Sequence, residues 1–244
     1  MSKVLIIIPA YNEQDCIENV VMKIKAEIKD NTNIDICVIN DGSTDKTLEK
    51  IMKLQKENDI IALNLINNLG IGGAVQTGYR YAYYNDYDIA IQIDGDGQHD
   101  PKYIFDMIKL LEENKCDMVI GSRFCDKTKY KQTFMRMFGS NILSFIIKLL
   151  SHKKIYDVTS GYRGVNKKII KRFYIEYPYD YPETCTNLSL ELSKKKIIEI
   201  PVEMNKRETG VSSISPIKAV SFMLKVTLTL LITKFRKQVK DDDI

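Results

Sequence analysis

The first half of the chain alternates short apolar runs with segments that carry apolar residues at helical spacing. The apolar runs cover residues 3–8, 34–39, 60–65, 89–93 and 118–120, and the helical patterns cover 18–29, 44–56, 72–84 and 101–113. Strands interleaved with helices form a parallel sheet, and ligands of such sheets bind beyond the carboxyl ends of the strands. We therefore predict an α/β fold with a site at that edge.

Length and composition are consistent with this class. A chain of 244 residues, 44% hydrophobic and 28% charged, is typical of one large globular domain, or of one domain with an appendage. The net charge of +4 is too weak by itself to indicate nucleic acid, but it suits an anionic ligand or a membrane surface. We find neither a run of about 20 apolar residues nor a signal-peptide pattern, so we expect a protein of the cytosolic side.

Cysteines and histidines exclude several kinds of chemistry. The five cysteines are scattered and never spaced as C-x-x-C, which favours free thiols over a zinc site or a disulfide framework. Only two histidines occur, His99 and His152, and no G-x-S-x-G motif accompanies them. Catalysis would therefore depend on carboxylates, arginines and a hard metal ion.

Polar clusters follow three of the expected strands. They are Pro9–Glu13, Asn40–Ser43 and Asp94–Asp96. Each cluster alone could be a loop or a helix cap, but together they should converge on one crevice at the carboxyl edge of the sheet.

Asp94 and Asp96 carry the clearest chemical signal. Alternate residues of an extended segment project to the same side, so the two carboxylates and the amide oxygen of Gln98 offer oxygen ligands to Mg²⁺ or Mn²⁺. A metal held by so few protein atoms has open positions for a substrate diphosphate. Gly95 and Gly97 leave room for a ligand to approach the backbone.

A glycine-rich turn at residues 68–74 opens the third helical segment and superficially resembles a dinucleotide-binding motif. That motif should follow the first strand, whereas this turn follows the third, so we reject a nicotinamide cofactor. The sequence also has no G-x-x-x-x-G-K-[ST] motif of a P-loop nucleotidase.

The second half contains two markedly apolar stretches, 142–150 and 217–235. On a helix, the second places Lys218, Lys225 and Arg236 near one stripe, opposite a broad apolar arc. This pattern is typical of a helix that lies in a membrane interface, and a core or dimer helix is the alternative. We expect a domain over 1–213, including an apolar helix at about 137–151, and an amphipathic membrane-interface helix with an acidic tail over 214–244.

A series of motifs in order along the chain resembles glycosyltransferase family 2, whose members have the GT-A fold. The motifs are I-P-A-Y-N-E (8–13), N-D-G-S-T-D (40–45), N-L-G-I-G-G (68–73), D-G-D-G-Q-H-D-P (94–101), G-S-R (121–123), D-V-T-S-G-Y-R (157–163) and R-E-T-G-V-S-S (207–213). The branch that looks most similar contains dolichol-phosphate mannose synthases and bacterial polyprenyl-phosphate glycosyltransferases. This resemblance implies a mostly parallel central sheet flanked by helices, with interfacial helices at the C-terminus.

The resemblance also implies roles for individual residues. The nucleotide sugar would contact Pro9, Tyr11, Glu13, Asp41, Asp94, Gly95 and Arg207. The metal ion would bind Asp94, Asp96 and Gln98, and the acceptor phosphate would bind Arg123 and Arg136. The catalytic set would be Asp96, Arg123 and Asp157.

The implied reaction is an inverting transfer of a hexose or N-acetylhexosamine. The donor would be a UDP- or GDP-linked sugar, and the acceptor dolichyl or undecaprenyl phosphate for a cell-surface glycan or polysaccharide. An ionised phosphate needs no deprotonation, so alignment and stabilisation of the leaving diphosphate would suffice. We expect a peripheral enzyme at the cytoplasmic face of the membrane, with a small membrane protein or a second copy as a possible partner and no nucleic acid.

Two other functions stay open at this point. Transfer to a glycan hydroxyl would need a carboxylate base, for which Asp157 and Glu183 are candidates, although Asp157 could instead order its loop by bonding Thr159 and Ser160. A non-catalytic nucleotide-sugar-binding module is the second. Ile71 and Ser213 replace lysines of the mannose synthase pattern, which argues against GDP-mannose as the donor.

Overall fold

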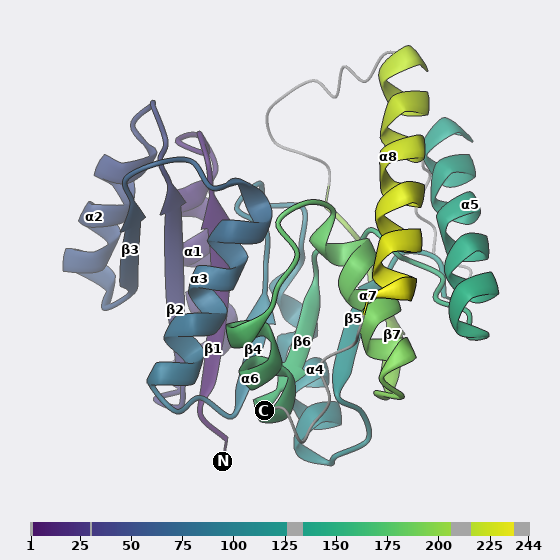
Figure 1. Cartoon of the computed structure of the whole chain (residues 1–244). Coiled ribbons are helices and arrows are strands. Elements are labelled where there is room, and N and C mark those ends of the chain that lie inside the picture. Colours follow the sequence, from purple (N-terminus) through teal and green to yellow (C-terminus); the bar gives the residue numbers. More distant parts are fainter. Residues whose placement is uncertain (1, 30, 126–133, 206–215, 237–244) are drawn as a thin grey trace.

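A seven-stranded sheet forms the centre of the computed structural model, which describes residues 2–29, 31–125, 134–205 and 216–236 (Figure 1). The strands are β1 (Val4–Ala10), β2 (Ile34–Asp41), β3 (Ile61–Leu65), β4 (Ile89–Gln92), β5 (Met118–Ser122), β6 (Arg163–Asn166) and β7 (Ile197–Pro201). Their order is β3-β2-β1-β4-β6-β5-β7, and β6 alone is antiparallel to its neighbours. The predicted mostly parallel sheet is confirmed.

The apolar runs of the sequence become the middle of this sheet. Every residue of β1 is buried, because β2 and β4 pair with its two edges and helices cover both faces. Its side chains alternate, so that Ile6 and Ile8 face one layer of helices while Leu5 and Ile7 face the other. A strand buried on both faces is expected to be continuously apolar, as this one is.

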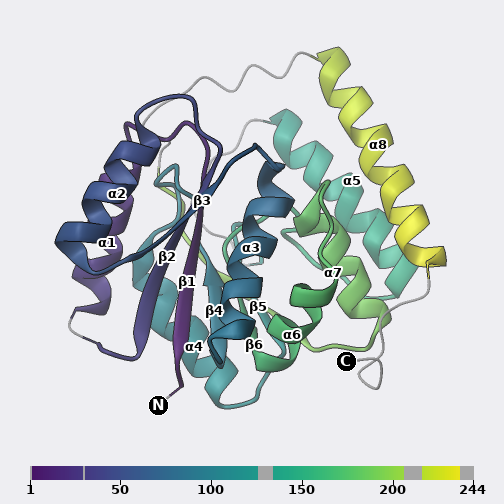
Figure 2. The ribbon, with the colours of Figure 1, turned by 60° about the vertical axis from the view of Figure 1, so that its left-hand side comes forward.

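Two layers of helices enclose the sheet (Figure 2). One layer contains α1 (Ile17–Ile28), α2 (Thr47–Asn58) and α4 (Ile104–Glu112), which is preceded by a short 3₁₀ turn, η1 (Pro101–Tyr103). The other contains α3 (Gly70–Tyr84), α5 (Phe134–Ser151), α6 (Lys167–Ile175), α7 (Pro182–Leu192) and α8 (Pro216–Phe235).

The second half holds elements that the sequence did not reveal. Strand β6 enters the sheet between β4 and β5 in the opposite direction. The segment before it, residues 157–162, therefore begins at the edge where the parallel strands end. This reversal brings a further stretch of chain to the predicted site.

Helices α5 and α8 lie side by side and run in the same direction (Figures 1 and 2). Lys234 Nζ donates a hydrogen bond to the backbone carbonyl of Leu150 at 2.7 Å. Helix α8 also contacts α7, and Val226 and Leu230 on that side are buried. The alternative of a packed helix therefore holds for one side of α8.

The other side of α8 is exposed and apolar. With exposed residues of α5 it forms what we name the α5–α8 surface, which comprises Phe145, Leu149, Leu224, Leu228, Leu231, Ile232 and Phe235, each 40–85% exposed. Lys225 and Arg236 are also exposed, and Arg236 pairs with Glu176 at 2.7 Å. The predicted separation into a basic stripe and an opposite apolar arc was too simple, because part of that arc is buried and the rest borders the basic residues.

Among the described helices, none is long and apolar enough to cross a bilayer. The predicted boundary after residue 213 and the acidic tail lie outside the described residues.

Candidate nucleotide-sugar site

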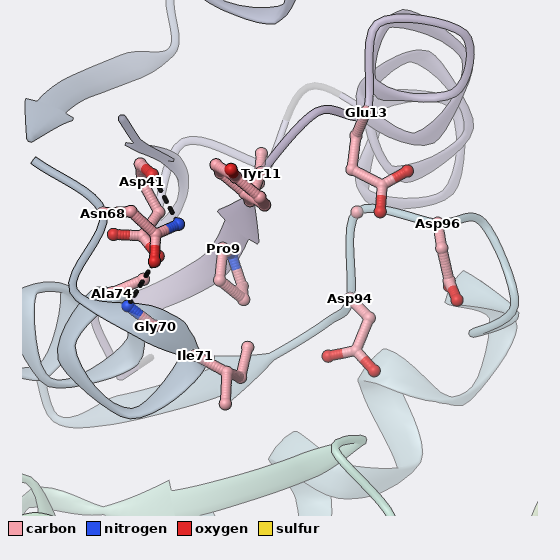
Figure 3. Close-up of a pocket in the computed structure, with 12 residues that line it drawn as sticks. Pro9, Tyr11, Glu13, Asp41, Asn68, Gly70, Ile71, Ala74, Asp94 and Asp96 are labelled. Atoms are coloured by element: carbon pink, nitrogen blue, oxygen red, sulfur yellow. Dashed lines mark hydrogen bonds between the residues drawn. The ribbon is translucent and has the colours of Figure 1, made fainter. Parts of the chain in front are cut away.

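A pocket of about 350 Å³ opens at the carboxyl ends of β1, β2 and β4 (Figure 3). Its lining comprises Pro9, Ala10, Tyr11, Glu13, Asp41, Asn68, Gly70, Ile71, Ala74, Asp94, Gly95 and Asp96. The structure thus brings together every residue that we predicted for the nucleotide sugar except Arg207, which lies outside the described residues. It adds Ala10 and the glycine-rich turn before α3.

The glycine-rich turn belongs to the pocket because Asp41 holds it there. The backbone N–H of Leu69 donates to Asp41 Oδ1 at 2.7 Å, and Asn68 Nδ2 donates to the backbone carbonyl of Asp41 at 3.0 Å. Gly70 adopts a φ of 75°, in the left-handed region that favours glycine. The sequence marked this turn, and the structure shows that it lines the pocket.

The loops after β1 and β2 are tied to each other. Asn12 donates its backbone N–H to Ser43 Oγ at 3.0 Å, and its own Oδ1 accepts from the backbone N–H of Thr44 at 2.9 Å. Glu13 donates its backbone N–H to Thr47 Oγ1 at 2.8 Å. These contacts fix Tyr11 and Glu13 at the rim, where Tyr11 is about half exposed.

Local hydrogen bonds shape the loop that carries Asp94 and Asp96. The backbone N–H of Asp94 donates to His99 Nδ1 at 3.0 Å, and the backbone N–H of Gln98 donates to Asp96 Oδ1 at 3.0 Å. Gln98 is not among the lining residues, so its observed contact with the site is the backbone bond to Asp96. His99 was missed as a residue that orders the loop, although it lies within the quoted motif.

The charge of the pocket shows whether a metal ion would fit there. Glu13, Asp94 and Asp96 lie at one end of it and Asp41 at the other (Figure 3), while the described lining includes no lysine or arginine. Such a pocket would repel a diphosphate unless a cation lay between them. Carboxylate oxygens are the ligands that Mg²⁺ and Mn²⁺ prefer, so the residues present fit such an ion.

No cluster of three or more His, Cys, Asp or Glu within the described ranges could hold a metal by itself. An ion at Asp94 and Asp96 would complete its coordination with ligand phosphate and water, as Mg²⁺ commonly does.

Arg123 and Asp157 form a bidentate ion pair beyond the end of β5. Arg123 Nε donates to Asp157 Oδ2 and its NH2 group to Asp157 Oδ1, both at 2.7 Å. The backbone N–H of Arg123 also donates to Asp157 Oδ2, at 2.9 Å. Asp157 is fully buried. Both of its carboxylate oxygens accept bonds from the Arg123 guanidinium, which we predicted to bind the acceptor phosphate.

Glu199 on β7 binds the backbone next to this ion pair. Its carboxylate accepts the backbone N–H groups of Tyr156 and Asp157, both at 2.8 Å, and burial raises its pKa. Thr159 Oγ1 lies 3.5 Å from Asp157 Oδ1, as one of our alternatives expected, whereas Ser160 Oγ donates to the backbone carbonyl of Gly121 instead.

The segment before β6 connects this ion pair with Asp94. A Cβ atom added to Gly161 would lie 2.8 Å from both carboxylate oxygens of Asp94, so the backbone closes against that side chain. Arg163, which is fully buried, donates two bonds to the backbone carbonyl of Ser160 and one to Thr186 Oγ1. The D-V-T-S-G-Y-R motif thus bridges Asp94 and Arg123.

Two other predicted residues lie apart from the pocket lining. Arg136 is in the first turns of α5, where the side chains lie outside the described part of the structure. Glu183 is in the first turn of α7, and burial raises its pKa, although the nearby Arg163 opposes the shift.

Comparison with known families assigns the chain to one of them. The model of "Glycosyl transferase family 2" matches residues 5–173, which is more than half of the sequence. The chain belongs to glycosyltransferase family 2. The resemblance predicted from the motifs is confirmed, and the family assignment makes the protein a glycosyltransferase.

Named relatives share most of the chain. A UDP-N-acetylglucosamine–dolichyl-phosphate N-acetylglucosaminyltransferase of Methanococcus voltae is 32% identical over 82% of this chain and 84% of its own length. A polyprenol monophosphomannose synthase of Mycolicibacterium smegmatis is 24% identical over 92% of this chain and 85% of its own.

A solved structure confirms the GT-A-like fold. Glucosyl-3-phosphoglycerate synthase from Mycobacterium tuberculosis, crystallised with Mn²⁺, UDP and phosphoglyceric acid, superposes with a TM-score of 0.69. The sequence identity is 16%, and the match covers 97% of this chain and 80% of that one. At this identity the likeness concerns the fold alone.

Proposed function

We propose that this enzyme transfers a hexose or N-acetylhexosamine from a nucleoside-diphosphate sugar to a polyprenyl phosphate. The observation that carries the proposal is the carboxylate-lined pocket at the ends of β1, β2 and β4 in a family 2 chain whose named relatives act on such lipids. An exposed apolar surface on α5 and α8 gives the same chain a place to meet a lipid.

The donor half of the site is assigned to the pocket residues. Asp41, Pro9 and Tyr11 bind the nucleoside, and Asp41 also holds the glycine-rich turn at the pocket by accepting the backbone N–H of Leu69. Asp94 and Asp96 would hold a Mg²⁺ or Mn²⁺ ion, with Gln98 supporting Asp96. When bound, such an ion would offset the charge of the donor diphosphate and of the departing nucleoside diphosphate.

The acceptor half is assigned to Arg123. A guanidinium pairs bidentately with phosphate oxygens, and a bound carboxylate fixes its orientation. We assign Asp157 to that orienting role, because both of its oxygens already accept bonds from Arg123. Arg136 and Arg207 are proposed to add positive charge for the acceptor and donor phosphates.

The reaction that these roles support is a single in-line displacement with inversion. The attacking phosphate oxygen is already ionised near neutral pH and needs no general base. The protein contributes alignment of the two phosphorylated substrates and electrostatic stabilisation of the leaving group. Asp157 takes part in no proton transfer in this reaction.

We propose peripheral binding to the cytoplasmic face of the membrane through the α5–α8 surface. Its exposed leucine and phenylalanine side chains would insert at the boundary between headgroups and acyl chains. The exposed Lys148 and Lys225 would contact anionic headgroups.

The direct test supplies purified protein and Mn²⁺ with UDP-N-acetylglucosamine, UDP-glucose or GDP-mannose, each labelled in the sugar, and undecaprenyl phosphate. We expect label in the organic phase with one donor, loss of transfer in Asp96→Asn, and no transfer to undecaprenol. Arg123→Ala should raise the KM for the lipid far more than the KM for the donor. Transfer to undecaprenol or to a glycan at equal rate would refute the phosphate acceptor.

A further inference from the structure

A buried glutamine contacts one of the carboxylates that line the pocket. Gln92 is the last residue of β4 and is fully buried. It is two residues before Asp94 and faces the same helix layer as Ala90, within an otherwise apolar cluster. A leucine would fill this place without any hydrogen-bonding requirement.

The amide of Gln92 contacts Asp94. Its Nε2 donates to Asp94 Oδ1 at 3.3 Å. Together with His99, whose Nε2 lies 3.6 Å from Asp94 Oδ2, and the close backbone of Gly161, this contact constrains the carboxylate at three points. The side chain of Asp94 is still 37% exposed and lines the pocket. A ligand in the pocket can therefore reach the carboxylate that Gln92 holds.

Other buried polar atoms lie in the same region. The hydroxyls of Tyr79 and Tyr177, Gln92 Oε1 and Asn187 Oδ1 are sealed from solvent and have no hydrogen-bond partner among the described residues. The two tyrosine rings lie 5.4 Å apart, and Arg163 is the partner of Gln92 in the β4–β6 register. Burial raises the pKa of both tyrosines, so each hydroxyl stays protonated and able to donate.

The two ends of the amide differ in their contacts. Nε2 donates to the carboxylate of Asp94, whereas Oε1 has no hydrogen-bond partner among the described residues. A buried polar atom without a hydrogen-bond partner destabilises the fold, and Gln92 Oε1 is such an atom. An apolar residue would avoid that cost, but only the amide supplies the hydrogen bond to Asp94.

We propose that Gln92 is a positioning residue, which holds the Asp94 carboxylate in the orientation that binds the divalent cation. The proposal rests on the proposed function, since it requires a metal-dependent nucleotide site. Groups that orient metal ligands typically change metal affinity about 10- to 100-fold when they are removed.

The test compares Gln92→Leu with Gln76→Leu. Gln76 on α3 is a matched control, because it is also a buried glutamine with one bond, from Nε2 to the backbone carbonyl of Phe173, and it does not line the pocket. UDP and GDP are first titrated into wild-type protein with Mn²⁺, and the tighter nucleotide is used. Calorimetry then gives its affinity without metal and the Mn²⁺ concentration for half-maximal binding, and Mn²⁺ electron paramagnetic resonance reports the bound ion.

We expect Gln92→Leu to raise the half-maximal Mn²⁺ concentration about 10-fold or more, with metal-free nucleotide affinity within about twofold of wild type. Gln76→Leu should leave both values unchanged. Equal Mn²⁺ dependence in the two variants would overturn the role of Gln92. Failure of wild-type protein to bind either nucleotide with Mn²⁺ would instead refute the proposed function. If Gln92→Leu does not fold, Gln92→Met, of similar length and without the amide, replaces it under the same criteria.

Discussion

Removing two leucines from the α5–α8 surface should detach the protein from lipid vesicles. Leu224 and Leu228 are 68% and 60% exposed, so they contribute little to the packing of α8 on its neighbours. Complete burial of a leucine is worth about 1.5–3 kcal/mol, and the exposed fractions scale this to about 1–2 kcal/mol for each side chain. The double variant Leu224→Ser/Leu228→Ser should therefore lose about 2–4 kcal/mol of membrane affinity, which corresponds to about 30- to 700-fold.

Vesicle flotation at several lipid concentrations measures this loss, with vesicles that contain anionic and neutral lipid in equal parts. A matched control is Met22→Ser/Met52→Ser, because these methionines are 49% and 42% exposed on α1 and α2, at the other side of the molecule (Figure 1). Both double variants should keep the melting temperature and circular dichroism of the wild type. Flotation of the leucine variant at wild-type lipid concentrations would refute this docking surface.

Three further substitutions address the site. Asp94→Asn should reduce turnover at least 100-fold even with excess Mn²⁺, because the proposed metal site loses one of its carboxylates; steady-state kinetics across Mn²⁺ concentrations check this. Asp157→Ala should lower the free energy of unfolding by about 3–5 kcal/mol in urea titrations, since it leaves Arg123 without its buried partner. Gly161→Ala should lower kcat about 10-fold while circular dichroism stays unchanged, because its Cβ would displace the Asp94 carboxylate.

The first half of the fold could be predicted because its signals are local. The run Val4–Ala10 is buried on both faces, and such a strand is recognisable from its residues alone. The polar clusters that follow three strands also converge as expected, because parallel strands end at one edge of a sheet.

The missed elements depend on distant partners. Strand β6 consists of Arg163-Gly164-Val165-Asn166, which carries little apolar character, and its conformation comes from pairing with β4 and β5 on both sides. The bond between Arg123 and Asp157 joins residues 34 positions apart, so no spacing rule reveals it. The sequence nominated both residues as candidates but could not show that their side chains pair with each other.

The Arg123–Asp157 pair also joins the two ends of the segment that leaves the sheet after β5 and returns to it at β6. That segment carries α5 and the smaller part of the α5–α8 surface, Phe145 and Leu149, while the sheet is continuous without it. Lengthening a closed loop costs only about 0.6 kcal/mol for each doubling of its length. A change in the length of this segment therefore costs little chain entropy and leaves in place the strands β1, β2 and β4 that carry the pocket.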